Sequence, residues 1–284
     1  MSYLYLSNLV HSARAKRESV ASNPILWLAG AALFTLLLIS FSSTMMLAID
    51  PFQHGDLLMD RYKPPSYEHL FGTDKFGRDV LARTLYGARI SLLIAIGVVL
   101  VAFFIGTLYG LISGYAGGWL DQGMMYVLDF LLAFPAIFLL MFLLAMFQMN
   151  HWWLIPILGL TGWMETARLV RAEVLTVKER DFMHAAIGLG LSRWRIISRH
   201  ILPNVLTSVL ITIPFKVADV ILLESALSFL GLGVQPPIPS WGNLINDGRS
   251  VLLSAWWIST APALFILFTT LIFNVIGDRL RKQL

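Results

Sequence analysis

The stretch EVLTVKERDFMHAAIGLGLSRWRIISRHILPN, residues 173–204, joins two long apolar segments of the chain. A charged, amphipathic beginning is followed by the pair Ala185-Ala186, by Gly190 and by Pro203, where a new apolar run starts. This order predicts a compact helix-turn-helix. Small residues permit the close approach of another protein and a rigid turn transmits displacement, so the unit suits docking into a partner's groove. An ordinary basic loop would explain the arginines, but not this order of alanine, glycine and proline.

The sequence on either side of this stretch is too apolar for a soluble protein. Of 284 residues, 57% are hydrophobic and 13% are charged, whereas a soluble domain carries about 25% charged residues. No soluble core of this size hides so much apolar sequence. The formal charge of +4 and the pI near 9.4 would suit nucleic acid or an anionic membrane surface, and the hydrophobicity favours the membrane. Cysteine is absent, which excludes disulfides, thiolate metal sites and a cysteine nucleophile.

Six mostly apolar runs are candidates for helices that cross a bilayer, which requires about 20 such residues. They predict an all-α integral membrane fold with spans at about 25–49, 90–115, 123–147, 152–172, 204–223 and 251–276. The spans lie in one domain, residues 25–284, after a tail of residues 1–24. The fourth run reaches Glu165 early, so we expect it to continue into a setting covered by protein or water.

The distribution of basic residues orients these spans. Six spans place both termini on one side, and 13 of the 21 lysines and arginines fall on that side against seven on the other. Both termini and the loop of about 173–203 are therefore predicted to be cytoplasmic. The insertions at 50–88 and roughly 225–250 are expected to fold against the outer mouth.

Charged residues within spans are candidates for a transport pathway or for pairing inside the membrane. The candidates are Asp129, Glu165, Lys216, Asp219 and Glu224. Asp129 and Glu165 are expected near helix ends, where neighbouring arginines neutralise them. Lys216 and Asp219 are three residues apart and share a helix face, so they could pair. Contact with the transported substrate is the open alternative for that pair.

Two other patterns are best explained by structure. Ala102, Gly106, Gly110 and Gly114 recur at every fourth position, a small-residue stripe that lets another helix approach the second span closely. In residues 74–79, two carboxylates flank basic residues that are able to pair with them, which favours a charge-paired loop over a cation site.

Motifs of catalysis are missing from the sequence. The phosphate-binding pattern G-x-x-x-x-G-K-[ST], the G-x-S-x-G elbow and the H-E-x-x-H pair do not occur. The six histidines show no i, i+4 pair with a carboxylate between them. We therefore expect neither an enzyme nor a chain that binds a cofactor or a metal.

The segment quoted first resembles the signature of the permease subunits of ATP-binding cassette (ABC) importers, in the dipeptide, oligopeptide and nickel branch. The signature reads Glu-Ala-Ala, three residues, Gly, nine residues, Ile, one residue, Leu-Pro. The matching positions are Ala185, Ala186, Gly190, Leu202 and Pro203. His184 stands in the Glu position and His200 in the Ile position. The His-Ile-Leu-Pro-Asn ending is similar to the peptide branch in particular.

Three further blocks agree with this family, in the right order. They are residues 71–80 (FGTDKFGRDV), residues 121–135 with Ala133-Phe134-Pro135 at their end, and residues 224–242, which begin ESALSFLGLG. Tyr126 occupies a position where the family often has Arg. The resemblance covers nearly the whole chain after the first span.

The resemblance implies the type I ABC importer transmembrane (MetI-like) fold, with a coupling helix that inserts into an ATPase subunit. The coupling residues it implies are Asp181, His184, Ala185, Ala186, Gly190, Arg193, Arg195, His200, Leu202 and Pro203. It also implies a second homologous permease, two cytoplasmic ATPase subunits that carry ATP and Mg, an extracytoplasmic substrate-binding protein and surrounding membrane lipid. The chain would form half of a pathway in the bacterial inner membrane for peptides or a related small solute.

The alternative function is an ion-coupled secondary transporter that uses Lys216, Asp219 and Glu165 as coupling groups. Such transporters usually have interrupted helices in corresponding positions of their two halves, and the sequence shows no matching pair of Gly/Pro breaks. Members of the importer branch carry peptides, nickel or its chelates and some oligosaccharides, so the sequence leaves the substrate open.

Overall fold

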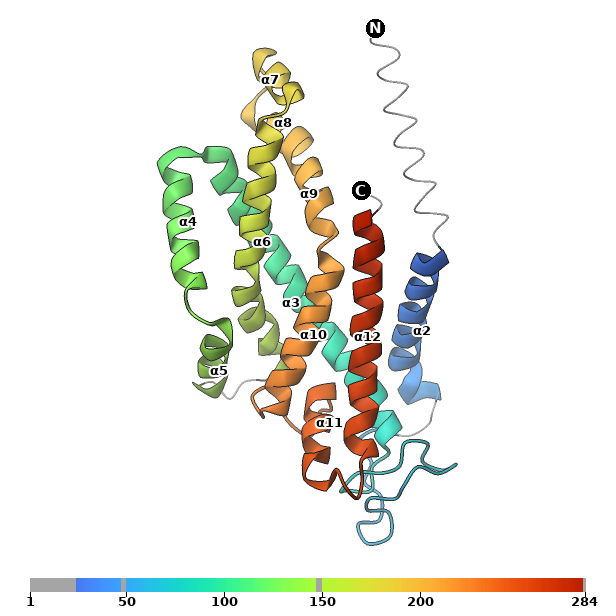
Figure 1. Ribbon diagram of the computed structural model, residues 1–284. Coiled ribbons are helices and arrows are strands. Elements are labelled where there is room, and N and C mark those ends of the chain that lie inside the picture. Colours follow the sequence, from blue (N-terminus) through green and yellow to red (C-terminus); the bar gives the residue numbers. More distant parts are fainter. Residues whose placement is uncertain (1–23, 47–49, 147–149, 283–284) are drawn as a thin grey trace.

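The computed structural model describes residues 24–46, 50–146 and 150–282, which form a bundle of helices without a strand in that part of the chain (Figure 1). The all-α prediction is confirmed. The predicted tail of residues 1–24, except for its last residue, lies outside the described residues, as do the ends of the first and third predicted spans and the last two residues of the chain.

The described part of the chain contains up to five segments that could cross a membrane by length and composition. Three helices are long and apolar enough to cross a membrane by themselves: α2 (Pro24–Met46), α3 (Val80–Ala116) and α12 (Trp257–Lys282). Two bent segments pass the same test as pairs: α4 (Gly118–Leu132) with α5 (Ala136–Met146), and Arg193–Leu210 with α10 (Ile213–Phe229). The long helix α6 (Leu154–Lys178), which follows the short turn η1 (His151–Trp153) and covers the fourth predicted span, carries several charges and does not pass this test.

The helix bounds differ from the predicted spans at several places: α6 ends at Lys178 and not at about 172, and α10 ends at Phe229 and not at about 223. Three further differences have a clear local cause. α3 begins ten residues before position 90, because the Asp79 side chain accepts a hydrogen bond from the Ala82 N–H at 2.8 Å and caps the helix there. α12 begins at Trp257 and not at 251, because the turn η3 (Arg249–Val251) and the residues after it precede the helix.

The third difference is that the predicted span 123–147 is bent by 73° between α4 and α5, just before Pro135. Proline has no N–H to continue a helix and restricts the residue before it. The fifth segment bends by 49° ahead of α10, which has Pro214 in its first turn. The third and fifth segments are not equivalent members of a three-plus-three repeat, so these bends do not form the paired interruption of many secondary transporters.

The small-residue stripe on α3 packs against α6. A Cβ atom added to Gly106 would lie 2.6 Å from the Thr166 Cβ, and one added to Gly114 would lie 2.9 Å from the Val174 Cβ. These separations leave no room for a side chain, so the stripe brings the two backbones together as expected. This close packing fixes α6 and the charged side chains that it carries.

The two ends of the bundle have different structures. Figure 1 shows the start of α2, the end of α12 and the short helices α7 (Asp181–Gly188) and α8 (Arg193–Ile196) at one end. The loop of residues 50–79 and α11 (Trp241–Gly248) lie at the other end. The two predicted outer insertions therefore occupy the same end of the bundle, opposite α7.

Specific contacts hold the two insertions together. Lys75 Nζ lies 2.8 Å from Asp247 Oδ1 on α11, so this lysine does not pair within its own loop. Arg78 Nε lies 2.7 Å from Asp74 Oδ2, as expected for a charge-paired loop.

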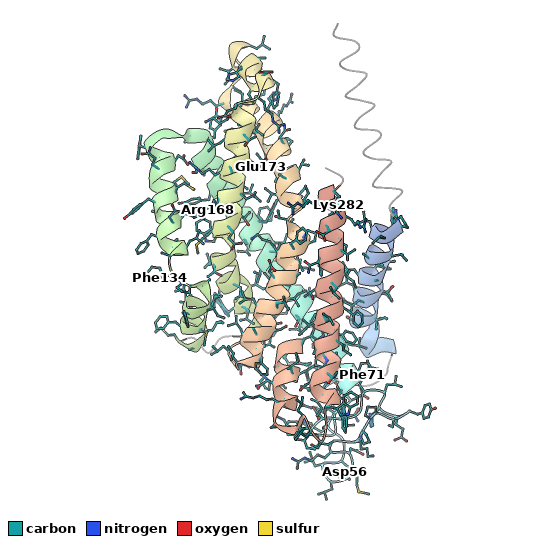
Figure 2. The ribbon with its side chains drawn as sticks, viewed as in Figure 1. Asp56, Phe71, Phe134, Arg168, Glu173 and Lys282 are labelled. Atoms are coloured by element: carbon teal, nitrogen blue, oxygen red, sulfur yellow. The ribbon has the colours of Figure 1, made fainter. Side chains whose placement is uncertain are left out.

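Near the tip of the loop, a hydrogen bond from Lys63 lowers the pKa of the Asp60 carboxyl from its ordinary value. Figure 2 places Asp56, in the same turn, at the extreme end of the molecule.

Candidate functional site

A cavity of about 230 Å³ lies between α3, α6, α10 and the break that joins α4 to α5. Most of its wall is apolar, and its charged lining residues are Glu165 on α6 and Lys216 and Asp219 on α10. A second hollow of about 570 Å³ shares Leu132 and Glu165 with the first and continues along α6 to Arg168. Together they form an open, partly charged surface along α6, which we call the α6 surface.

Ion pairs tie α6 to the helices on both sides of this surface. Glu165 Oε2 lies 2.6 Å from Lys216 Nζ on α10. Arg168 Nη2 lies 2.5 Å from Asp129 Oδ1 on α4, and Figure 2 shows Arg168 on the side of α6 that faces α4. Farther along α6, two guanidinium nitrogens of Arg171 each lie 2.6 Å from an oxygen of Asp121. Sequence reasoning did not single out Asp121 as a charge partner. The available signal was an acidic residue in one predicted span and a basic residue, Arg171, in the next.

The expected arginine partner is found for Asp129 and not for Glu165, and the expected pairing of Lys216 with Asp219 is wrong. Asp129 pairs with Arg168, one of its expected partners. Lys216 bonds to Glu165 across the α6–α10 contact and not to Asp219 on its own helix. The Asp219 side chain is exposed, lines the cavity and makes no hydrogen bond or ion pair with the residues that the structure describes. Spacing along α10 suggested Asp219 as the partner of Lys216, but it could not reveal Glu165 on α6.

Glu224 lies in the core of the bundle and does not line the cavity. Its side chain is fully buried and accepts hydrogen bonds from Ser91 Oγ at 2.9 Å and Ser228 Oγ at 2.7 Å. The same hydroxyl groups accept hydrogen bonds from the backbone N–H groups of Trp241 and Val234. Glu224 therefore joins α3 and α10 to the outer insertion, and its assignment as a pathway candidate is corrected to a structural one.

The predicted coupling segment forms the end of the bundle that carries α7. Met183 packs into an apolar cluster with Val174 and Val177 of α6. Ala186 is also buried. The three residues Asp181, His184 and Ala185 are exposed on one face of α7. After α8, a π-helical turn η2 (Ile197–Ile201) leads into α9 (Leu202–Leu210), which carries Pro203 in its first turn.

The remaining predicted coupling residues lie in α8 and at the start of the next membrane segment. Arg193, Arg195 and Pro203 are exposed, and His200 and Leu202 are partly buried. The Phe182 and His200 rings lie with their centroids 6.3 Å apart, so the end of the segment packs back on α7. The structure thus brings the predicted residues together at one end of the bundle.

Gly190 ends the α7 turn in a conformation that favours glycine. Its φ is +70°, and this left-handed turn lets the Leu191 N–H bond to the Ala186 carbonyl oxygen at 3.3 Å. A Cβ added at Gly190 would meet no atom within 4 Å. The requirement for glycine here is one of backbone conformation, not of space inside this chain.

Large apolar side chains surround this turn and are open to solvent. The exposed fractions are 59% for Ile187, 80% for Leu189 and 77% for Trp194, and Phe182 is also exposed. Sequence reasoning did not single out these four residues. Several large apolar side chains exposed around one turn mark a site of protein–protein or membrane interaction. We call these four residues the α7 patch.

Residues 106–284, more than half of the chain, match the family described as the inner membrane component of binding-protein-dependent transport systems. The chain belongs to this family. The match includes the α7 patch, the Gly190 turn and most of the α6 surface. The chain is therefore a permease subunit of an ABC transport system and an inner membrane component.

Curated relatives resemble this permease over most of their length. It is 44% identical over 216 residues to the oligopeptide transport system permease protein OppC of Haemophilus influenzae, a match that covers 76% of this chain and 70% of that protein. It is 39% identical over 282 residues to the dipeptide transport system permease protein DppC of Bacillus subtilis, covering 95% and 87% of the two chains. These relatives support the importer prediction and not the secondary transporter.

Solved structures show the same fold at low sequence identity. A chain of the MetNI methionine ABC transporter in an inward-facing conformation superposes with a TM-score of 0.56 at 14% identity, covering 72% of this permease and 97% of that chain. A chain of an amino acid ABC transporter with histidines gives 0.55 at 13% identity, covering 72% and 95%. The predicted type I importer fold is thereby confirmed.

Proposed function

We propose that this permease imports peptides as one half of a pathway, with a homologous permease as the other half. Two cytoplasmic ATPase subunits drive the cycle, and an extracytoplasmic binding protein supplies the solute. The observation that carries the proposal is the α7 patch, an exposed apolar surface at the end of the bundle opposite the outer insertions. The names of the oligopeptide and dipeptide permease relatives support peptides as the substrate class.

The α6 surface is the proposed half-pathway. In the single chain the side chains of Glu165, Asp129 and Arg168 are 72%, 61% and 56% exposed. Charged side chains at membrane depth face a protein interior or a water-filled cavity and avoid lipid. A second permease that covers this surface would enclose the charges in a hydrated path, whereas lipid would leave them poorly solvated.

The α7 patch is the proposed coupling site. Apolar side chains on a short helix are suited to a groove in another protein, and the exposed Asp181, His184 and Ala185 face outward beside them. We place this end, with both termini, in the cytoplasm, on the basis of the excess of lysine and arginine there. ATP and Mg then bind to the ATPase subunits, and this chain carries no cofactor and performs no catalysis.

Uptake by the purified complex tests the function. The complex is isolated through a tag on this permease, reconstituted in proteoliposomes and supplied with tritiated trialanine. We expect uptake that requires ATP and the binding protein and that is unaffected by collapse of ion gradients. Uptake driven by a proton or sodium gradient in the absence of ATP would instead support the secondary transporter.

A further inference from the structure

Asp219 is the unneutralised charge of the cavity described above. The cavity lining contains one cation, Lys216, and two carboxylates, Glu165 and Asp219. Glu165 and Lys216 are paired at 2.6 Å and neutralise one another. The remaining lining residues are uncharged, so the cavity has an excess of one negative charge.

The packing of α10 keeps this carboxylate on the cavity side. Lys216, Asp219 and Leu223 line the cavity at spacings of three and four residues, which is one helix face. Val217 and Ile221 are buried on the opposite face, in a cluster shared with α3 and α12. Asp219 therefore cannot turn towards a partner in the core without unwinding a packed helix.

The charge of Asp219 and the apolar wall of the cavity together determine which kind of ligand binds here. A carboxylate in a largely apolar cavity interacts strongly with an incoming cation, because low-dielectric walls focus its field. The wall also includes Val98, Leu158 and Val220, which suit the alkyl part of an organic cation. A bare metal ion would need several ligands, and the described residues contain no group of three or more metal-ligating acidic or histidine side chains.

We propose that Asp219 binds the ammonium group of the solute during its passage through the permease. This inference rests on the proposed function, and it adds that the pathway selects solutes that carry a positive charge. The ammonium group comes either from the free amino terminus of a peptide or from a lysine side chain. Solutes without a cationic group gain no binding energy from Asp219, and its carboxylate repels anionic solutes.

The local charge is measurable without transport, because the native chain has no cysteine. Leu223→Cys places one thiol on the cavity face, one helical turn from Asp219. In membrane vesicles that contain the whole complex, this thiol is modified with a trimethylammonium-ethyl or a sulfonatoethyl methanethiosulfonate. We expect Asp219→Asn to lower the ratio of the cationic rate to the anionic rate by about tenfold.

Two matched variants act as controls for this ratio. Glu68→Gln removes an exposed carboxylate of the outer loop, and the ratio should stay at the level of Leu223→Cys alone. The combined change Glu165→Gln and Lys216→Met removes a neutral pair, so it should also leave the ratio nearly constant. A ratio that Asp219→Asn does not change would overturn the inference.

Competition identifies the source of the cation. The same thiol is modified with neutral methyl methanethiosulfonate in the presence of glycinamide, which has only an α-ammonium, or N-acetyl-lysinamide, which has only an ε-ammonium. Slowing by either amine in the Asp219 chain, and not in Asp219→Asn, supports the inference and names the source. An equal rate with and without both amines contradicts it. ATP-driven uptake of trialanine tests the proposed function separately, so the two failures are distinguishable.

Discussion

The double substitution Ile187→Asp and Leu189→Asp is expected to release the ATPase subunits from the permease and to abolish ATP-driven uptake. Both side chains are largely exposed in the free chain. Burial of a large apolar side chain contributes about 1.5–3 kcal/mol, and a carboxylate in its place also has to be desolvated. A combined loss of about 4 kcal/mol or more lowers the affinity roughly 1,000-fold. The measurement is the amount of ATPase that remains bound to the tagged permease.

The control for this variant is Leu58→Asp. Leu58 is 93% exposed in the outer loop, at the end of the bundle opposite α7. The control makes the same chemical change in a residue of similar exposure, and it should leave the ATPase subunits bound. If the double variant in α7 inserts normally and still retains them, the α7 patch is not the coupling site.

Breaking the Glu165–Lys216 pair is expected to reduce assembly of the permease complex, and removing both charges together is expected to restore it. Lys216→Met leaves Glu165 without its cation, and Glu165→Gln leaves Lys216 without its anion. Each single change should cost about 1–2 kcal/mol, less than for a fully buried pair because Glu165 is 72% exposed. The double-mutant cycle is read from the yield of assembled complex on native gels.

A second double variant separates this pair from the Lys216–Asp219 pair that the sequence suggested. If Lys216 pairs with Glu165, the combination of Lys216→Met with Asp219→Asn leaves Glu165 unpaired and gives no recovery. Recovery in that variant, together with none in Lys216→Met with Glu165→Gln, would show that Lys216 pairs along its own helix after all.

Apolar length and small-residue spacing predicted the fold well, because both are local properties. The stripe at Gly106, Gly110 and Gly114 correctly indicated a helix packed against α3. The start of α3 was missed because the hydrophobic run begins later than its cap, Asp79. The bend before Pro135 was missed because proline within an apolar run is compatible with either a kinked or a broken helix.

The charged residues of the site were predictable as a set but not as pairs. Lys216 and Glu165 lie 51 positions apart, and no local rule reports a contact across two helices. Glu224 was indistinguishable from a pathway residue until the structure placed it against Ser91 and Ser228. The order of residues in the sequence identified the segment that contains the α7 patch. It could not show that Leu189 and Trp194 are exposed, because exposure depends on how the chain folds.

Cross-linking from α7 tests the coupling mechanism most directly. Leu189→Cys introduces one thiol into a chain that has none of its own, and a short bifunctional reagent that joins a thiol to an amine is added to the assembled complex. We expect a product that contains this permease and an ATPase subunit, and no such product from Leu58→Cys at the other end. A product from Leu58→Cys alone, or from neither position, would contradict the assignment of α7 as the segment that couples this permease to ATP hydrolysis.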